Sequence, residues 1–149
     1  MALSGMESAK HARRFVKFCI VGASSTLIQM VTMKAVEVAM HSQSDVAAQL
    51  GNGAGAILAI ANGFYWNRRW TYRLHGEPGA HSQFARFFGV SLVGLLLNWS
   101  IFHIFLVRLG LFRGFAHADI LNQLLTISCV VVWNFTANTL WTFRAPDAD

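Results

Sequence analysis

Four long stretches of the chain contain no charged residue, and all four are rich in apolar side chains. A helix needs about 20 predominantly apolar residues to cross a hydrocarbon core of about 30 Å. Three stretches reach that length, and the shorter first one lies between Lys17 and Lys34, whose long side chains can reach the membrane surface. The stretches cover residues 18–33, 46–67, 87–107 and 120–143. The pattern predicts four transmembrane helices, at about residues 15–37, 46–67, 84–107 and 120–143.

Composition favours the membrane over a soluble helical core. Hydrophobic residues make up 54% of the 149 residues and charged residues 13%, whereas soluble domains carry about 25% charged residues. The helices of a soluble all-α protein would each show a charged face towards water, and none of the four stretches does. We therefore expect an all-α membrane protein that forms a single domain over residues 1–149.

The first stretch has one alternative interpretation, a cleaved signal peptide. Lys10, Arg13 and Arg14 form a basic segment before it, as such a peptide requires. However, the apolar run is longer than the core of a typical signal peptide, and three more apolar stretches follow. We expect an uncleaved first transmembrane helix.

The positions of the basic residues predict the orientation in the membrane. With four spans, both termini and the middle loop lie on the same side. Nine of the twelve basic residues fall on that side, and only Lys34, Arg108 and Arg113 fall on the other. The nine are Lys10, Arg13, Arg14, Lys17, Arg68, Arg69, Arg73, Arg86 and Arg144. The positive-inside rule then predicts that both termini are cytoplasmic. Because these charges flank the predicted spans, membrane lipids with anionic headgroups explain them better than nucleic acid does.

The second and fourth stretches end on similar sequences, NRRWTYR at residues 67–73 and NTLWTFR at residues 138–144. The endings match at an offset of 71 residues, and the starts of the two halves match at an offset of 69, as in Phe18–Phe87 and Val21–Val90. Anchoring at the membrane surface explains the aromatic and basic composition but not the shared order. The sequence predicts two repeats, at about residues 12–73 and 83–144. Since each repeat has two spans, the repeats are expected to be parallel.

Six basic residues are predicted to lie at one level of the cytoplasmic boundary. They are Lys17, Arg68, Arg69, Arg73, Arg86 and Arg144. An arginine side chain donates paired hydrogen bonds that suit a phosphate group. The predicted site is a cationic ring for the phosphate of a lipid headgroup, and the alternative is that these residues only anchor and orient the helices.

Polar residues within the spans suggest either a path for hydroxyl groups or hydrogen bonds between helices. On a helix, Asn67 and Trp70 share a face, as do Asn138 and Trp141. These four residues, with Asn98, are the predicted path-lining set. Simple interhelical hydrogen bonding is the competing explanation for each amide. In the second stretch, Gly51 and Gly55 form a pattern that permits close approach of another helix.

Other chemistry finds little support in the sequence. Cys19 and Cys129 lie inside predicted spans with no CxxC motif, so we expect apolar filling rather than redox chemistry or metal binding. Lys34 and Glu37 are spaced to pair with each other near the outer end of the first span. No nucleophile–base pair, phosphate-binding glycine loop or metal cluster is recognisable. We expect neither an enzyme nor a cofactor.

Three segments resemble the GtrA-like family. They are RFVKFCIVG at residues 14–22, NGFYWNRRWTY at residues 62–72 and WNFTANTLWTF at residues 133–143. The resemblance extends over about residues 12–144, and its most specific part is the Asn-x-x-Trp-Thr-aromatic ending, present here twice. The second copy has Thr139 and Leu140 where the first has Arg68 and Arg69.

The resemblance implies a small four-span protein of the bacterial cytoplasmic membrane that acts in cell-surface polysaccharide synthesis. It implies a flippase for a polyprenyl-phosphate-linked sugar, with a membrane glycosyltransferase as partner. The alternatives are a non-transporting adaptor for that glycosyltransferase and a small multidrug exporter. The exporter would need a carboxylate in the middle of the first span, which this chain lacks. Four short spans enclose little room for a headgroup, so a homo-oligomer is a further expectation.

Overall fold

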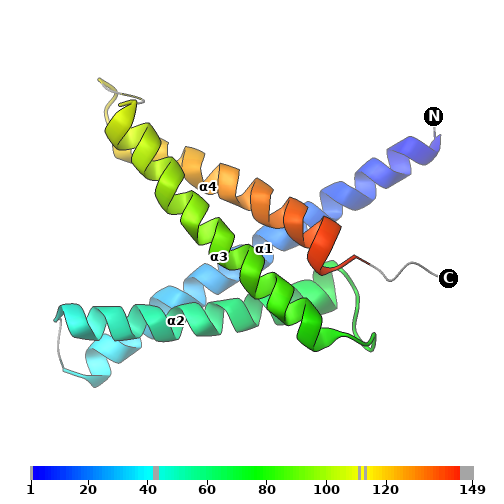
Figure 1. Ribbon diagram of the computed structural model, residues 1–149, viewed down its shortest axis with the longest axis horizontal. Coiled ribbons are helices and arrows are strands. Elements are labelled where there is room, and N and C mark those ends of the chain that lie inside the picture. The colour runs from blue at the N-terminus through cyan, green and yellow to red at the C-terminus, as the bar shows by residue number, and fades with distance from the viewer. Residues whose placement is uncertain (1, 42–43, 111, 113, 145–149) are drawn as a thin grey trace. The chain divides into compact units, whose positions relative to one another are not determined.

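All regular secondary structure in the part of the chain that the structure describes is helical. The computed structural model describes residues 2–41, 44–110, 112 and 114–144, without the side chains of residues 2–6, 105–107 and 119. Its four long helices are α1 (Ala2–Ala39), α2 (Asp45–Trp66), α3 (Ala80–Phe102) and α4 (Ala118–Ala137) (Figure 1). No strand occurs among the described residues. The predicted all-α class is confirmed.

Three of these helices continue into a short π-helical turn. The turns are η1 (Asn67–Thr71) after α2, η2 (His103–Arg108) after α3 and η3 (Asn138–Thr142) after α4. In η1 the Tyr72 N–H donates to the Asn67 carbonyl over 2.8 Å, and in η3 the Phe143 N–H donates to the Asn138 carbonyl over 2.9 Å. Each of these bonds spans five residues instead of four, which widens the last turn of the helix.

The chain divides into two compact units between Pro78 and Gly79. The boundary falls within the polar segment that separates the two predicted repeats. In the first unit, α1 packs against α2 and η1, and in the second, α3 packs against α4 and η3. Each unit is therefore a helical hairpin, in which the second helix and its π-helical turn pack against the first helix.

Among the described residues, three helical segments are long and apolar enough to cross a membrane. They are Glu7–Ala39, Ala80–Phe102 and Ile120–Thr142. α2 is not among them, although it has 22 residues. Its sequence includes Gly51, Asn52 and Gly53 in succession, which lower its hydropathy. The second predicted span, residues 46–67, stays a prediction.

In the first unit, the backbones of α1 and α2 approach closely. A Cβ atom added to Gly51 would lie 2.9 Å from the Met33 carbonyl oxygen, and one added to Gly55 would lie 2.7 Å from the Gln29 carbonyl oxygen. Any side chain at these two positions would overlap the backbone of α1. The close approach predicted from the Gly-x-x-x-Gly spacing is confirmed.

Amide side chains join α1 and α2 at two levels. Gln29 Nε2 donates to Asn52 Oδ1 over 2.7 Å. Asn62 Nδ2 lies 3.0 Å from both the Ser24 and the Ser25 hydroxyl oxygens and donates to them. For Gln29 and Asn62, the interhelical hydrogen bonds that the sequence left as one alternative are present.

The amides of α4 and η3 in the second unit bond mainly within their own helical segment. Asn122, Asn134 and Asn138 each donate to a carbonyl four residues earlier, at 2.9, 3.1 and 2.7 Å. The contact between helices comes instead from Trp133, whose indole N–H donates to the Val90 carbonyl over 3.3 Å. The first hairpin thus uses amide hydrogen bonds between its helices, and the second uses an indole hydrogen bond.

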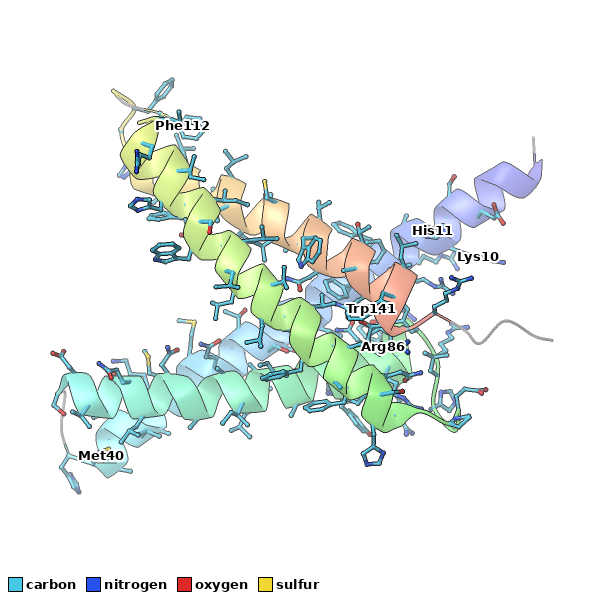
Figure 2. All side chains as sticks on the ribbon, in the orientation of Figure 1. Lys10, His11, Met40, Arg86, Phe112 and Trp141 are labelled. Atoms are coloured by element: carbon cyan, nitrogen blue, oxygen red, sulfur yellow. The ribbon has the colours of Figure 1, made fainter. Side chains whose placement is uncertain are left out.

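Two further details concern α1. The helix begins at Ala2, well before the predicted span of residues 15–37, so Lys10 and His11 lie on a helical extension (Figure 2). Near its other end, Lys34 Nζ lies 2.7 Å from Glu37 Oε2, which confirms the predicted ion pair. Of the three basic residues predicted on the outer side, Arg113 lies outside the described residues.

Candidate functional site: cation–indole contacts at the helix ends

In the first unit, a lysine of α1 contacts the end of the returning helix. Lys17 Nζ donates to the Trp70 carbonyl over 3.3 Å and lies 5.0 Å from the centroid of the Trp70 ring. The last carbonyls of a helix lack partners within the helix and carry partial negative charge. Lys17 therefore provides a hydrogen bond, a favourable charge–dipole interaction and a cation–π contact at one residue.

In the second unit, Arg86 of α3 makes the equivalent contact with Trp141 (Figure 2). Its Nη1 donates to the Trp141 carbonyl over 3.3 Å, and its guanidinium carbon lies 5.9 Å from the ring centroid. Lys17 and Arg86 are 69 residues apart and Trp70 and Trp141 are 71 residues apart, which are the offsets found in the sequence. In both hairpins, a cation of the first helix thus contacts a tryptophan at the carboxyl end of the second.

The amide and the indole of each ending, expected on one face, differ in exposure. Asn67 is 3% exposed while Trp70 is 38% exposed, and Asn138 is 1% exposed while Trp141 is 55% exposed. The wider π-helical turn changes the register, so that Thr71, rather than Trp70, shares the buried environment of Asn67. Asn67 and Asn138 therefore lie inside the hairpins, with the indoles outside.

These buried turns contain polar oxygens with no hydrogen-bond partner among the described residues. They are Asn67 Oδ1, Thr71 Oγ1, Asn138 Oδ1 and Thr142 Oγ1. A buried polar atom without a partner destabilises the fold by about 1–3 kcal/mol. The same pair of residue types is buried in this way in both units, so the feature belongs to the shared motif rather than to one hairpin.

The remaining predicted cations surround the first ending more than the second. The Arg68 side chain donates from Nη2 to the Glu77 carbonyl, and Arg69, Arg73 and Arg144 are exposed. Arg73 has φ +58° and follows η1, and the Leu74 N–H beside it donates to the Arg68 carbonyl over 2.8 Å, as in a glycine-terminated helix. Four of the six predicted cations belong to the first unit and two to the second. Their combination into one ring stays a prediction.

Asn98 differs from its counterpart in the first unit. It is half-buried on α3 and makes no hydrogen bond through its side chain among the described residues, whereas the matching Gln29 bonds to Asn52. Its neighbour Trp99 stacks on His103 with ring centroids 5.6 Å apart.

No group of three potential metal ligands occurs in the described part of the chain, and Cys19 and Cys129 are not in disulfides.

The comparison with protein families gives a match over both hairpins. The family model described as "GtrA/DPMS, transmembrane domain" matches residues 17–143. The chain belongs to this family. The GtrA/DPMS match begins at Lys17 and ends two residues after Trp141, so it includes both cation–indole contacts. A search of curated proteins found no match.

Sequence reasoning identified every residue of the two contacts but not how they bind. The sequence assigns Lys17 and Arg86 to a phosphate site, and Trp70 and Trp141 to the path for the sugar. Each cation pairs with the main-chain carbonyl of a tryptophan at the end of a π-helical turn. Residue types alone indicate neither the carbonyl contact nor the turn. The matched offsets of cation and indole were the one available indication.

Proposed function

We propose that this protein moves a polyprenyl-phosphate-linked monosaccharide across the bacterial cytoplasmic membrane, for modification of a cell-surface polysaccharide. It acts without catalysing a chemical reaction and works with a membrane glycosyltransferase that supplies the lipid-linked sugar. Membership of the GtrA/DPMS family supports this role. The observation that carries it is the repeated cation–indole contact at the ends of both hairpins.

The cations suit the charged part of such a lipid. Lys17, Arg69 and Arg73 lie at the same end of the first unit as Trp70, and all three are at least partly exposed. A phosphate group accepts charge-assisted hydrogen bonds, which are about twice as strong as neutral ones. At headgroup depth, these side chains capture the phosphate while the isoprenoid tail remains among lipid tails.

The membrane arrangement that we propose has four spans, including α2, in two parallel repeats with both termini in the cytoplasm. Support comes from matched burial in the two units. The residues buried in both are Phe18 and Phe87, Val21 and Val90, Asn67 and Asn138, Thr71 and Thr142, and Tyr72 and Phe143. All five pairs follow the offsets of the sequence repeat. The excess of basic residues on one side supports the orientation.

The sugar needs polar groups, and the buried endings contain unused acceptors. Asn67 Oδ1 and Asn138 Oδ1 accept no hydrogen bond among the described residues, and a sugar hydroxyl is a suitable donor. Because both amides are buried, they meet a sugar only when the ends of the hairpins open. Asn98, half-buried on α3, is the third amide of the proposed path.

The experiment that tests the function is lipid translocation in proteoliposomes. Purified protein is reconstituted with a fluorescent polyprenyl-phosphate sugar, and the fraction accessible to an outside quencher is followed over time. Exchange of Lys17 and Arg73 together for glutamine is expected to slow translocation at least tenfold, because each loss of a charge-assisted bond to phosphate weakens binding by about 1.5–3 kcal/mol.

The control is Arg108→Gln, which removes an exposed cation from the end of η2, after α3, and is expected to translocate at the normal rate. Insertion is checked by the yield of folded protein in the vesicles. An adaptor would leave the lipid in its original leaflet with the unaltered protein, and that result would refute transport. Equal rates for the double variant and the unaltered protein would refute the role of the cations.

A further inference from the structure

We propose that each hairpin has its own binding seat for a phosphate-bearing lipid headgroup, so that one chain binds two such lipids. The first seat is formed by Lys17 and Trp70, and the second by Arg86 and Trp141. This inference rests on the proposed function for its ligand class, and it replaces a single shared ring by two separate sites.

The hydrogen-bonding capacity of the cations supports two seats. The bond to the Trp70 carbonyl uses one of the three N–H donors of Lys17, and the bond to the Trp141 carbonyl uses one of the five donors of Arg86. Arg86 is exposed and Lys17 is half-buried, so the remaining donors are available to a phosphate oxygen from the lipid side. Each unit supplies these groups without help from the other.

The tryptophans act as positioning residues. A free lysine or arginine side chain samples many rotamers, and ordering it on binding has an entropic cost. In the first seat, Lys17 Nζ lies 3.3 Å from the Trp70 carbonyl oxygen and 5.0 Å from the centroid of the Trp70 ring. In the second, Arg86 Nη1 lies 3.3 Å from the Trp141 carbonyl oxygen, and the guanidinium carbon lies 5.9 Å from the ring centroid. Tryptophan is also enriched at membrane interfaces, where the proposed arrangement puts these indoles.

Helix polarity makes the cation essential to each seat. Both seats lie at the carboxyl end of a helix, where the partial charge is negative and repels an anion. Loss of the cation therefore exposes the phosphate to repulsion as well as removing its partner. The prediction is that neutralisation empties one seat and leaves the other filled.

Native mass spectrometry of the full chain in detergent, with farnesyl phosphate as the probe, counts the bound lipids directly. We expect two for the unaltered protein, one for Lys17→Gln, one for Arg86→Gln and none for the double variant. Lys17→Arg and Arg86→Lys, which exchange the cations of the two seats, are expected to retain two. Trp70→Leu and Trp141→Leu should each weaken one of the two binding steps about two- to fivefold, as loss of an exposed cation–π contact predicts.

Farnesol and inorganic phosphate separate the sources of affinity. Farnesol, which lacks the phosphate, should not bind in these seats. If millimolar inorganic phosphate displaces the probe fully, the seats bind free phosphate and not a lipid headgroup, and the proposed ligand class is wrong. Arg108→Gln serves as the charge-matched control and should bind two.

A single bound lipid, or loss of both lipids in either single glutamine variant, would overturn the two-seat proposal. If a glutamine variant fails to fold, the indole N–H signals of Trp70 and Trp141 in NMR spectra of the unaltered protein decide the matter. Both signals must shift on titration for two seats to exist. Two bound lipids without translocation in vesicles would refute transport and leave the seats standing, whereas translocation with one bound lipid would do the reverse.

Discussion

A single methyl group at Gly55 tests how closely the first hairpin is packed. A Cβ at this position would lie 2.7 Å from the Gln29 carbonyl oxygen and 3.1 Å from the Gln29 Cα, where ordinary contact begins at 3.4 Å. Both atoms belong to the backbone of α1, so no side chain can rotate away. The Gly55→Ala variant must therefore separate α1 from α2 or bend one of them.

The size of the effect follows from two opposing contributions. Overpacking of this kind costs about 1–3 kcal/mol. Replacing glycine by alanine within a helix contributes about 0.8–1 kcal/mol in the opposite direction. We expect a net loss of up to about 2 kcal/mol, with additional loss if the separation breaks the hydrogen bond between Gln29 and Asn52.

Gly53→Ala is the matched control in the same helix. No atom lies within 4 Å of the Cβ that this substitution adds, so only the helix-propensity gain applies and the variant should be at least as stable as the original. Because both variants make the same chemical change, their difference isolates the overpacking cost of about 1–3 kcal/mol.

The assay is reversible unfolding of the purified protein in mixed micelles by titration with sodium dodecyl sulfate, followed by circular dichroism. Gly94→Ala gives an intermediate case, since its Cβ would meet only side-chain atoms of Asn134, the nearest at 2.7 Å, and that side chain can move. Equal midpoints for Gly55→Ala and Gly53→Ala would refute the close backbone approach on which this reasoning depends.

Two further predictions use the same unfolding assay. Asn62→Ala removes the hydrogen bonds to Ser24 and Ser25 and should cost about 0.6–1.7 kcal/mol, whereas Ser128→Ala, which breaks a bond within its own helix, should cost less; equal losses would contradict the interhelical role. Arg73→Gly should raise stability by about 1 kcal/mol, because φ +58° suits glycine, whereas Arg73→Ala should give no such gain; identical stability of the two variants would show that this backbone conformation carries no strain.

The helices and the polar residues at their ends were predictable, because both follow from the composition of each stretch and from the spacing of residues along it. Uncharged stretches of 20 or more residues must form helices if they enter a membrane, since backbone groups find no partner in lipid. The Gly51 and Gly55 spacing and the Lys34–Glu37 pair were equally local signals, and the structure shows both. The helical extension before residue 15 was missed, because polar residues at a terminus carry no signal that separates helix from coil.

The order of residues alone is thus enough to derive the helical class, the family, the polar ends of the helices and the matched positions of cation and indole. Three features come from the packing of the folded chain. Lys17 and Arg86 bond to the main chain of Trp70 and Trp141, and the asparagines near these tryptophans are buried. Amides join the helices in the first hairpin, whereas in the second they bond within α4 and η3. These features need the folded chain because the burial of a side chain and its hydrogen-bond partner depend on how a helix ends and on what packs against it. A π-helical turn moves one residue inward and its neighbour outward, and residue type alone does not report such a turn.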